Sequence, residues 1–110
     1  MTTFAHCVRL STVLAIASAT PALAGGHVKV DIASLEFSPS VVTARVGDTV
    51  EWVNKDIVDH TATARNGDFD VTAPIGKSAR LRLKRSGKVV YYCRFHPNMI
   101  GTLHVLAHGK

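Results

Sequence analysis

The chain has 110 residues, which is enough for one small domain with a modest core and too few for a separate substrate domain. Its formal net charge is +5 at pH 7. The cations of the run "RLRLKRSGK" alternate with apolar residues, as on the solvent-facing side of a strand, so they do not indicate a nucleic-acid-binding surface. Length and charge therefore argue against an enzyme with an elaborate pocket and against a nucleic-acid partner.

The first 24 residues have the pattern of a secretory signal peptide. A single positive charge, Arg9, precedes an apolar stretch that ends near Ala19, and the small-residue sequence Ala22-Leu23-Ala24 follows. The apolar stretch is shorter than the roughly 20 residues that span a bilayer, so we expect no stable membrane insertion. We predict that residues 1–24 are removed, that the chain is exported to the periplasm, and that residues 25–110 form the mature domain.

Cleavage would leave a single cysteine in the mature domain, because Cys7 leaves with the signal peptide and Cys93 remains. An exported chain with one cysteine cannot form an internal disulfide. A lone thiol in an oxidising compartment needs protection or a function, which favours a metal-bound thiolate.

The mature domain is predicted to consist of short strands and turns, with no helical period of useful length. In chain order we expect a strand over 27–40 that breaks at Pro39, two strands around a turn at Val46-Gly47-Asp48, a strand over 60–64, a turn over 66–68, a hairpin over 77–93 that turns at Ser86-Gly87, and a closing strand over 100–108. Short strands at this spacing, with no βαβ pattern, predict an all-β antiparallel sandwich or barrel.

The segment "CRFHPNM" places Cys93, His96 and Met99 at intervals of three residues in the loop before the closing strand. A thiolate, a thioether and imidazoles together select copper among the common metals, whereas a structural zinc site would usually need a second cysteine or a carboxylate. Two imidazoles and a thiolate in a plane, with a long axial thioether, make a blue-copper electron-transfer site. The loop supplies only one of the two histidines.

Four histidines are candidates for the missing ligand: His27, His60, His104 and His108. His60 fits best, because it lies in "NKDIVDHTAT" where a loop meets a strand and could approach the second loop across the sandwich. His104 lies within an alternating strand, where an exposed or hydrogen-bonded histidine is the simpler interpretation. His108 lies close to the end of the chain.

These residues resemble the cupredoxins. The motif "CRFHPNM" followed by Ile100-Gly101, Tyr91 two residues before the cysteine, and "WVNKDIVDHTAT" upstream are similar to the group of amicyanin, plastocyanin and pseudoazurin, with the shorter loop spacing of amicyanin. The resemblance covers essentially the whole mature chain. It implies an eight-stranded Greek-key β-sandwich with one type 1 copper per chain, held by His60, Cys93, His96 and Met99, and it makes Tyr91 a structural tyrosine-corner residue.

The same resemblance implies a monomeric electron carrier, not an enzyme, that passes single electrons between periplasmic redox proteins. Its electron exit would be the exposed edge of His96, with Phe95 and Pro97 as an apolar docking patch. The basic run "RLRLKRSGK" would favour acidic redox partners if it docks at all, although a solvated strand face is the simpler interpretation. A copper-binding protein for sequestration or delivery stays open as an alternative, because it could use similar ligands.

Two residues depart from the pattern of the resembled group. Thr61 stands where the others have an asparagine that braces the two ligand loops, which leaves the bracing open. Arg94 brings a cation next to Cys93, and we expect it to raise the reduction potential modestly, because solvent screens it. A further hypothesis concerns the new N-terminus Gly25-Gly26-His27, whose four nitrogens could hold a second copper in a square plane.

Overall fold

The computed structural model describes residue 3, residues 11–12 and residues 25–108. The predicted signal peptide therefore lies outside the described residues, apart from three positions. Within the described ranges, no helix is long and apolar enough to cross a membrane.

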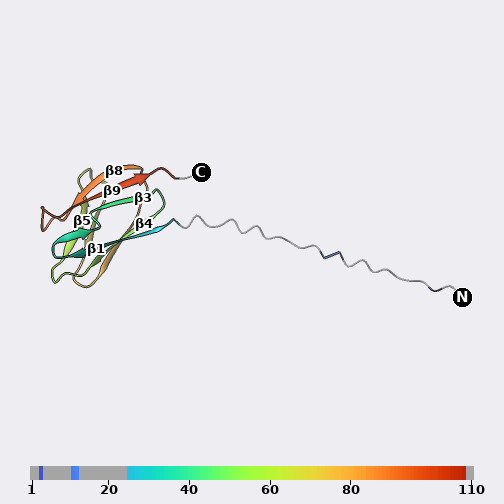
Figure 1. The fold of residues 1–110 in the computed structure, drawn as a ribbon, viewed down its shortest axis with the longest axis horizontal. Coiled ribbons are helices and arrows are strands. Elements are labelled where there is room, and N and C mark those ends of the chain that lie inside the picture. Colours follow the sequence, from blue (N-terminus) through green and yellow to red (C-terminus); the bar gives the residue numbers. More distant parts are fainter. Residues whose placement is uncertain (1–2, 4–10, 13–24, 109–110) are drawn as a thin grey trace.

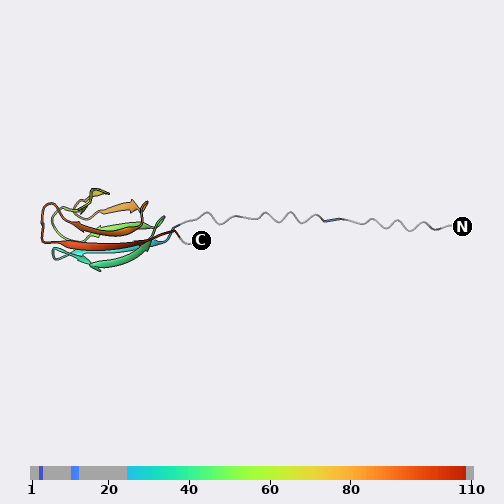
Figure 2. The ribbon, with the colours of Figure 1, turned by 90° about the horizontal axis from the view of Figure 1, so that it is seen from above.

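Nine strands make up the described domain. They are β1 (His27–Ala33), β2 (Glu36–Ser38), β3 (Val41–Arg45), β4 (Thr49–Asn54), β5 (His60–Ala64), β6 (Asp70–Ala73), β7 (Ser78–Arg82), β8 (Gly87–Tyr92) and β9 (Ile100–Leu106). Two sheets pack face to face (Figure 1), and Figure 2 shows their strands in stacked layers. One sheet has the strand order β2-β1-β4-β7 and the other β3-β9-β8-β5-β6. The all-β sandwich predicted from the sequence is confirmed.

The sandwich is not purely antiparallel, which corrects the prediction. β1 pairs with β4 in parallel, and so does β3 with β9, while the other strand pairs are antiparallel. The predicted hairpin over 77–93 is also wrong, because β7 pairs with β4 in one sheet whereas β8 pairs with β5 and β9 in the other. The chain crosses between the sheets over residues 83–86, and alternation alone does not say which sheet a strand joins.

The core lies between the sheets and follows the alternation of each strand. On β4 the inward residues Val50 and Trp52 are fully buried, while Glu51 between them points outward and accepts a hydrogen bond from Arg80. The Trp52 and Tyr91 rings meet edge to face with centroids 5.5 Å apart. Burial of these large apolar surfaces stabilises the domain.

The fold brings two distant loops to one end of the sandwich. The loop between β4 and β5 carries residues 55–59 and leads into His60, and the loop between β8 and β9 carries residues 93–99. Because β5 and β8 are antiparallel neighbours in the same sheet, the start of β5 and the end of β8 lie at the same end of the sandwich. The two segments singled out by the sequence therefore meet there.

Candidate metal centre

The loop from Cys93 to Met99 is built from two consecutive turns. The N–H of His96 donates to the carbonyl of Cys93 at 3.2 Å, and the N–H of Met99 donates to the carbonyl of His96 at 2.8 Å. The N–H of Cys93 then donates to the carbonyl of Met99 at 3.1 Å, which closes the loop at its base. Each interval of three residues in "CRFHPNM" is thus one hydrogen-bonded turn, which explains the spacing of the motif.

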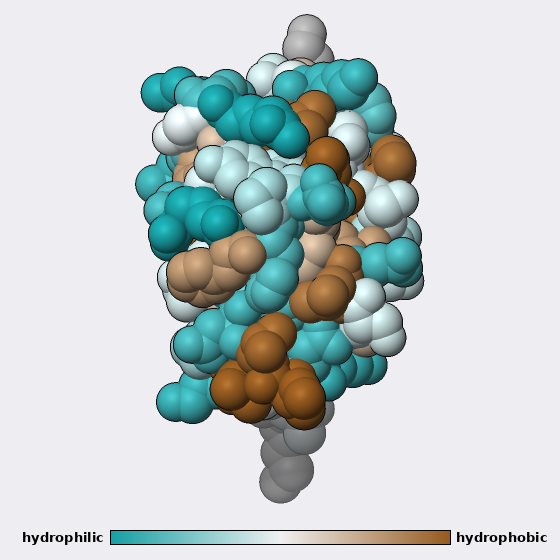
Figure 3. Space-filling view, turned by 90° about the vertical axis from the view of Figure 1, so that its left-hand side faces the viewer, coloured by the Kyte–Doolittle hydropathy of each residue, from teal (hydrophilic) through white to brown (hydrophobic). Residues whose placement is uncertain are grey.

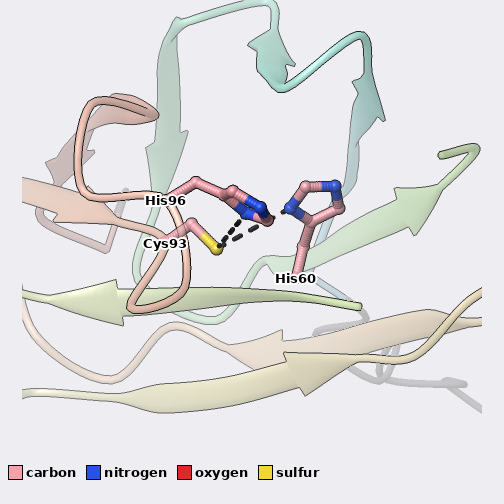
Figure 4. A group of neighbouring side chains, drawn as sticks. All are labelled: His60, Cys93 and His96. Carbon is pink, nitrogen blue, oxygen red and sulfur yellow. Dashed lines mark hydrogen bonds between the residues drawn. The ribbon is translucent and has the colours of Figure 1, made fainter. Parts of the chain in front are cut away.

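Three side chains converge between the loops (Figure 4): His60, Cys93 and His96. The Cys93 Sγ lies 3.7 Å from Nδ1 of His60 and 3.6 Å from Nδ1 of His96, and the three donor atoms all lie within 4.8 Å of one another. Metal–nitrogen and metal–sulfur bonds of about 2.0 and 2.3 Å, set about 120° apart, place nitrogen and sulfur about 3.7 Å apart. The donors therefore fit one trigonal first-row metal ion.

Met99 lies at the base of the same loop. Its side chain is buried, and its backbone bonds both to His96 and to Cys93. Among the described residues, the only cluster of at least three histidine, cysteine or acidic side chains with metal-ligand spacing is the one at His60, Cys93 and His96, so His27, His104 and His108 form no such group. Of the four candidate histidines, the structure thus brings His60 to the loop.

A carboxylate holds the outer side of the His60 ring. Nε2 of His60 lies 2.8 Å from Oδ2 of Asp56, and the ring is fully buried. An imidazole that donates Nε2–H to a carboxylate keeps its Nδ1 lone pair free, and here that lone pair points at Cys93. Asp56 thereby selects the tautomer that can bind a metal.

Asp56 is itself fixed by the backbone of another loop. It accepts N–H bonds from Leu35 at 3.0 Å and Ser34 at 2.7 Å, in the turn between β1 and β2. The bond from Leu35 is the main cause that lowers the pKa of Asp56, with further contributions from Ser34 and His60. The carboxylate is therefore charged at neutral pH. Sequence reasoning missed this residue, whose only signal was an acidic residue four positions before His60.

The buried Asn54 shapes the loop that carries Asp56 and His60. Its Nδ2 donates to the carbonyls of Val58 at 2.8 Å and Ala73 at 2.9 Å, and its Oδ1 accepts the N–H of Asp56 at 2.9 Å. Two of these hydrogen bonds join Asn54 to the loop that follows it, and the bond to Ala73 reaches β6 of the other sheet. Asn54 therefore holds the loop in one conformation before His60 begins β5.

Thr61 links the two loops in place of the asparagine of the resembled group. Its backbone N–H points at Cys93 Sγ at 3.4 Å, and its hydroxyl oxygen accepts the N–H of Arg94 at 2.9 Å. Thr61 is fully buried. The bracing that the sequence left open is thus present, with a hydroxyl as the acceptor.

Arg94 is paired, not simply solvated. Its Nε lies 3.2 Å from Oδ1 of Asp70, with the two side chains 42% and 52% exposed. The expectation that Arg94 raises the reduction potential stays a prediction, and the nearby carboxylate reduces its expected size.

Apolar side chains surround this end of the molecule. Ile57 is 88% exposed, Ile75 55% and Phe95 53%, and His96 is partly exposed beside Phe95 in the chain. The N–H of Ile75 donates to Asp59, which ties the β6–β7 loop to the loop that carries Ile57. Figure 3 shows the end with apolar side chains set among hydrophilic ones. We call Ile57, Ile75 and Phe95 the copper-end patch.

Comparison with known proteins shows which family has this fold and this set of side chains. The model of the cupredoxin-like domain matches residues 6–105. The chain belongs to the cupredoxin family. It is 29% identical to the amicyanin of Paracoccus denitrificans over 85 residues, covering 72% of this chain and 65% of amicyanin. It is 30% identical to the methylamine utilization protein MauL of Methylorubrum extorquens over 101 residues, covering 88% of this chain and 89% of MauL.

The solved structures agree with the sequence relatives. A variant of amicyanin in its reduced state superposes with a TM-score of 0.63 at 28% identity, covering 73% of this chain and 82% of the amicyanin chain. The cluster of His60, Cys93, His96 and Met99 gives this cupredoxin a type 1 copper site. The recognition of a cupredoxin from "CRFHPNM" and its upstream histidine is confirmed.

Tyr91 does not have the role that the resemblance implied. It lies inside β8 opposite Gly101, where an added Cβ would collide with the tyrosine ring. Its hydroxyl is buried and makes no hydrogen bond to the backbone of the described residues, whereas a tyrosine corner bonds its hydroxyl to the backbone. Burial raises the pKa of Tyr91 to about 12. Tyr91 is a core residue that packs over a glycine.

The hypothesis of a second copper at Gly25-Gly26-His27 stays a prediction. The N–H of Gly26 donates to Oδ1 of Asp48 at 2.6 Å, and His27 begins β1 opposite Thr49. A square-planar site would need the Gly26 nitrogen for the metal, so it would have to break this bond.

Proposed function

We propose that this cupredoxin is a periplasmic electron carrier whose copper is held by His60 Nδ1, Cys93 Sγ and His96 Nδ1, with the Met99 thioether as a weak axial ligand. The observation that carries the proposal is the trigonal set of three donor atoms. In it, Nδ1 of His60 and Nδ1 of His96 lie 3.7 Å and 3.6 Å from the Cys93 Sγ. A copper ion bound there would supply one-electron chemistry between Cu(I) and Cu(II). The protein would contribute the fixed positions of the donor atoms and the exclusion of water.

Hydrogen bonds from side chains and from the backbone hold the donor atoms in place before and after electron transfer. Asp56 fixes the His60 ring, Thr61 ties the cysteine loop to β5, and the two turns fix His96 and Met99. Donors that cannot move keep the reorganisation barrier low when the charge of the site changes. The burial of His60, Cys93 and Met99 excludes water from most of the site.

The copper-end patch supports a docking role for this end of the molecule. Exposed apolar side chains beside a partly exposed ligand histidine allow a partner to approach His96 closely. We propose redox proteins as the partners, with acidic ones favoured by the basic charge of the chain, and we expect association with them to slow as salt is added. The same proposal includes that the protein is a monomer, that it lies in the periplasm, and that it is not an enzyme.

Copper titration of the mature protein tests the proposal. One equivalent of Cu(II) should produce an intense blue absorption that bleaches on reduction and returns on oxidation. Cys93→Ser is the matched control, because it should lose the blue band while the fold remains, since core burial stabilises the sandwich. A colourless protein, or one that gives its metal readily to a chelator, would instead support the alternative of copper sequestration or delivery.

A further inference from the structure

A chain of hydrogen bonds runs from the cysteine loop across the outer face of β5 to β6. The N–H of Arg94 donates to Thr61 Oγ1 at 2.9 Å, Thr61 Oγ1 lies 2.9 Å from Thr63 Oγ1, and the Thr63 hydroxyl donates to Asp70 Oδ1 at 2.8 Å. The same oxygen of Asp70 lies 3.2 Å from Nε of Arg94. The chain therefore starts and ends on Arg94, and we call it the Arg94 ring.

The strand geometry explains why these groups meet. Thr61 and Thr63 are two residues apart on β5, so both side chains lie on the same face, opposite to that of His60. β6 pairs with β5 so that Asp70 stands beside Thr63. The first residue after Cys93 folds over this face and closes the ring.

The directions of the hydroxyl bonds follow from their chemistry. A hydroxyl has one proton, and the Thr63 proton goes to Asp70, whose ionised oxygen can only accept. The Thr61 proton must then point to Thr63, which leaves a lone pair of Thr61 Oγ1 for the N–H of Arg94. Each bond fixes the direction of the next, so Asp70 orients the Thr61 hydroxyl through the Thr63 hydroxyl.

The charge state of Asp70 agrees with this role. The hydrogen bond from Thr63 is the main cause that lowers the pKa of Asp70, and the Arg94 guanidinium lowers it further. The carboxylate is therefore the ionised anchor of the ring at neutral pH.

We propose that Thr63 and Asp70 are positioning residues of the copper centre: through the Thr61 hydroxyl they fix the Arg94 amide, and with it the distance from the Thr61 N–H to Cys93 Sγ. The proposal rests on the function proposed above. A hydrogen bond to the thiolate weakens its donation to copper and so favours Cu(I). Asp70 has a second effect, because its charge offsets that of Arg94 beside the site.

The two effects predict opposite shifts of the reduction potential. Thr63→Val breaks the ring but keeps the Asp70–Arg94 pair, so the Thr61 N–H should move away from the sulfur and the potential should fall. Asp70→Asn keeps an acceptor for Thr63 but removes a negative charge, so the potential should rise. We expect each variant to change the ratio of oxidised to reduced protein at a fixed potential by at least about twofold, the lower end of the effect of one hydrogen bond.

The experiment measures voltammetry of the copper-loaded protein and amide hydrogen exchange of the metal-free protein. In Thr63→Val the Arg94 amide should exchange at least about fivefold faster than in the wild type, because its acceptor is no longer oriented. Thr63→Ser keeps the hydroxyl and should restore both the exchange rate and the potential. Thr43→Val, which makes the same change at an exposed position of β3 in the same sheet, should alter neither.

The proposal would be overturned by an Arg94 exchange rate in Thr63→Val equal to that of the wild type, or by failure of Thr63→Ser to behave like the wild type. Shifts of the same sign in Thr63→Val and Asp70→Asn would also contradict it. Loss of the proposed electron-transfer function is a separate result, because a wild-type protein without a reversible wave would still show the predicted exchange difference if the ring positions Arg94.

Discussion

His60 has a partner on both sides of its ring, the Cys93 Sγ at Nδ1 and the carboxylate of Asp56 at Nε2. A negative partner makes the imidazole a stronger donor and stabilises the more positive oxidised copper. Asp56→Asn should therefore lower Cu(II) affinity by roughly tenfold, in the range of such outer contacts, and raise the reduction potential. Metal competition and voltammetry measure both quantities.

Asp59→Asn is the matched control for Asp56. It removes the same charge from the same loop, but the Asp59 carboxylate accepts the Ile75 N–H, whereas the hydrogen bond to the His60 ring comes from Asp56. Equal losses of affinity in the two variants would show that charge alone matters and would contradict the role of the Asp56–His60 bond.

Asp70 is expected to make the free energy of unfolding depend on pH in the acid range. Its pKa is lowered below the ordinary value of 3.8, first by Thr63 and then by Arg94. A carboxyl with a lowered folded pKa contributes stability above its unfolded pKa and loses that contribution as the pH falls through the folded pKa. In urea unfolding of the metal-free protein, the wild type should be more stable than Asp70→Asn at pH 7, and the difference should shrink steadily below pH 3.8.

The expected difference is modest, because the Asp70 side chain is 52% exposed and solvent screens its interactions. Parallel curves for wild type and Asp70→Asn from pH 7 down to pH 2 would contradict the assignment.

At the residue scale, the ligands were predictable and their supports were not. Cys93, His96 and Met99 stand at fixed intervals in one segment, so their chemistry is visible in the sequence. Asp56 and Asp70 act through strand pairing and through loops that meet only in the fold, and isolated acidic residues near a histidine or an arginine carry no comparable signal. The sequence shows Thr61 as a departure from the resembled group, but the bond of its hydroxyl to the Arg94 amide depends on where β8 ends.

The turn between β1 and β2 is the element most open to stabilisation. Ser34 and Leu35 have φ of 52° and 58°, a left-handed conformation that disfavours residues such as leucine. Leu35 is 49% exposed, so its side chain contributes little packing. Leu35→Asn should raise the free energy of unfolding by roughly 0.5–1 kcal/mol, because asparagine tolerates this conformation.

Val41→Asn is the control for this change. It also replaces an exposed apolar residue, but Val41 lies in β3, where asparagine has low strand propensity. Thermal unfolding should rank Leu35→Asn above the wild type and Val41→Asn at or below it. The opposite order would contradict the backbone argument.

Most strand segments are predictable from the sequence, but the strand expected over 27–40 is two paired strands, β1 and β2, and the pairing of the other strands is not predictable. Alternation identified β4, β5 and β9 and the turn that follows β5. It could not show that the chain crosses between the sheets over residues 83–86, because a hairpin turn and a crossover use the same small residues. It also missed β6 as a strand, since four residues with one strongly apolar side chain show no clear period.

At the scale of the whole molecule, one end serves as the electron exit in the proposed function. If the copper-end patch mediates docking, two copies that exchange electrons should meet through it. Phe95→Ser combined with Ile57→Ser should slow electron self-exchange by roughly tenfold, because both apolar contacts are lost in each of the two partners. NMR line broadening of mixed oxidised and reduced protein measures the rate.

Leu106→Ser is the control, since Leu106 is 43% exposed at the end of β9, whereas the ligand loop joins the start of that strand. Its self-exchange rate should match the wild type. A double variant that exchanges as fast as the wild type would place the exit elsewhere.

Reversible voltammetry of the copper-loaded mature protein tests the central claim most directly. The account predicts one stable one-electron wave with one copper per chain, which persists over repeated cycles because the donors are fixed by the fold. A protein that binds copper but gives no reversible wave, or that releases the metal on reduction, would contradict the proposed electron carrier.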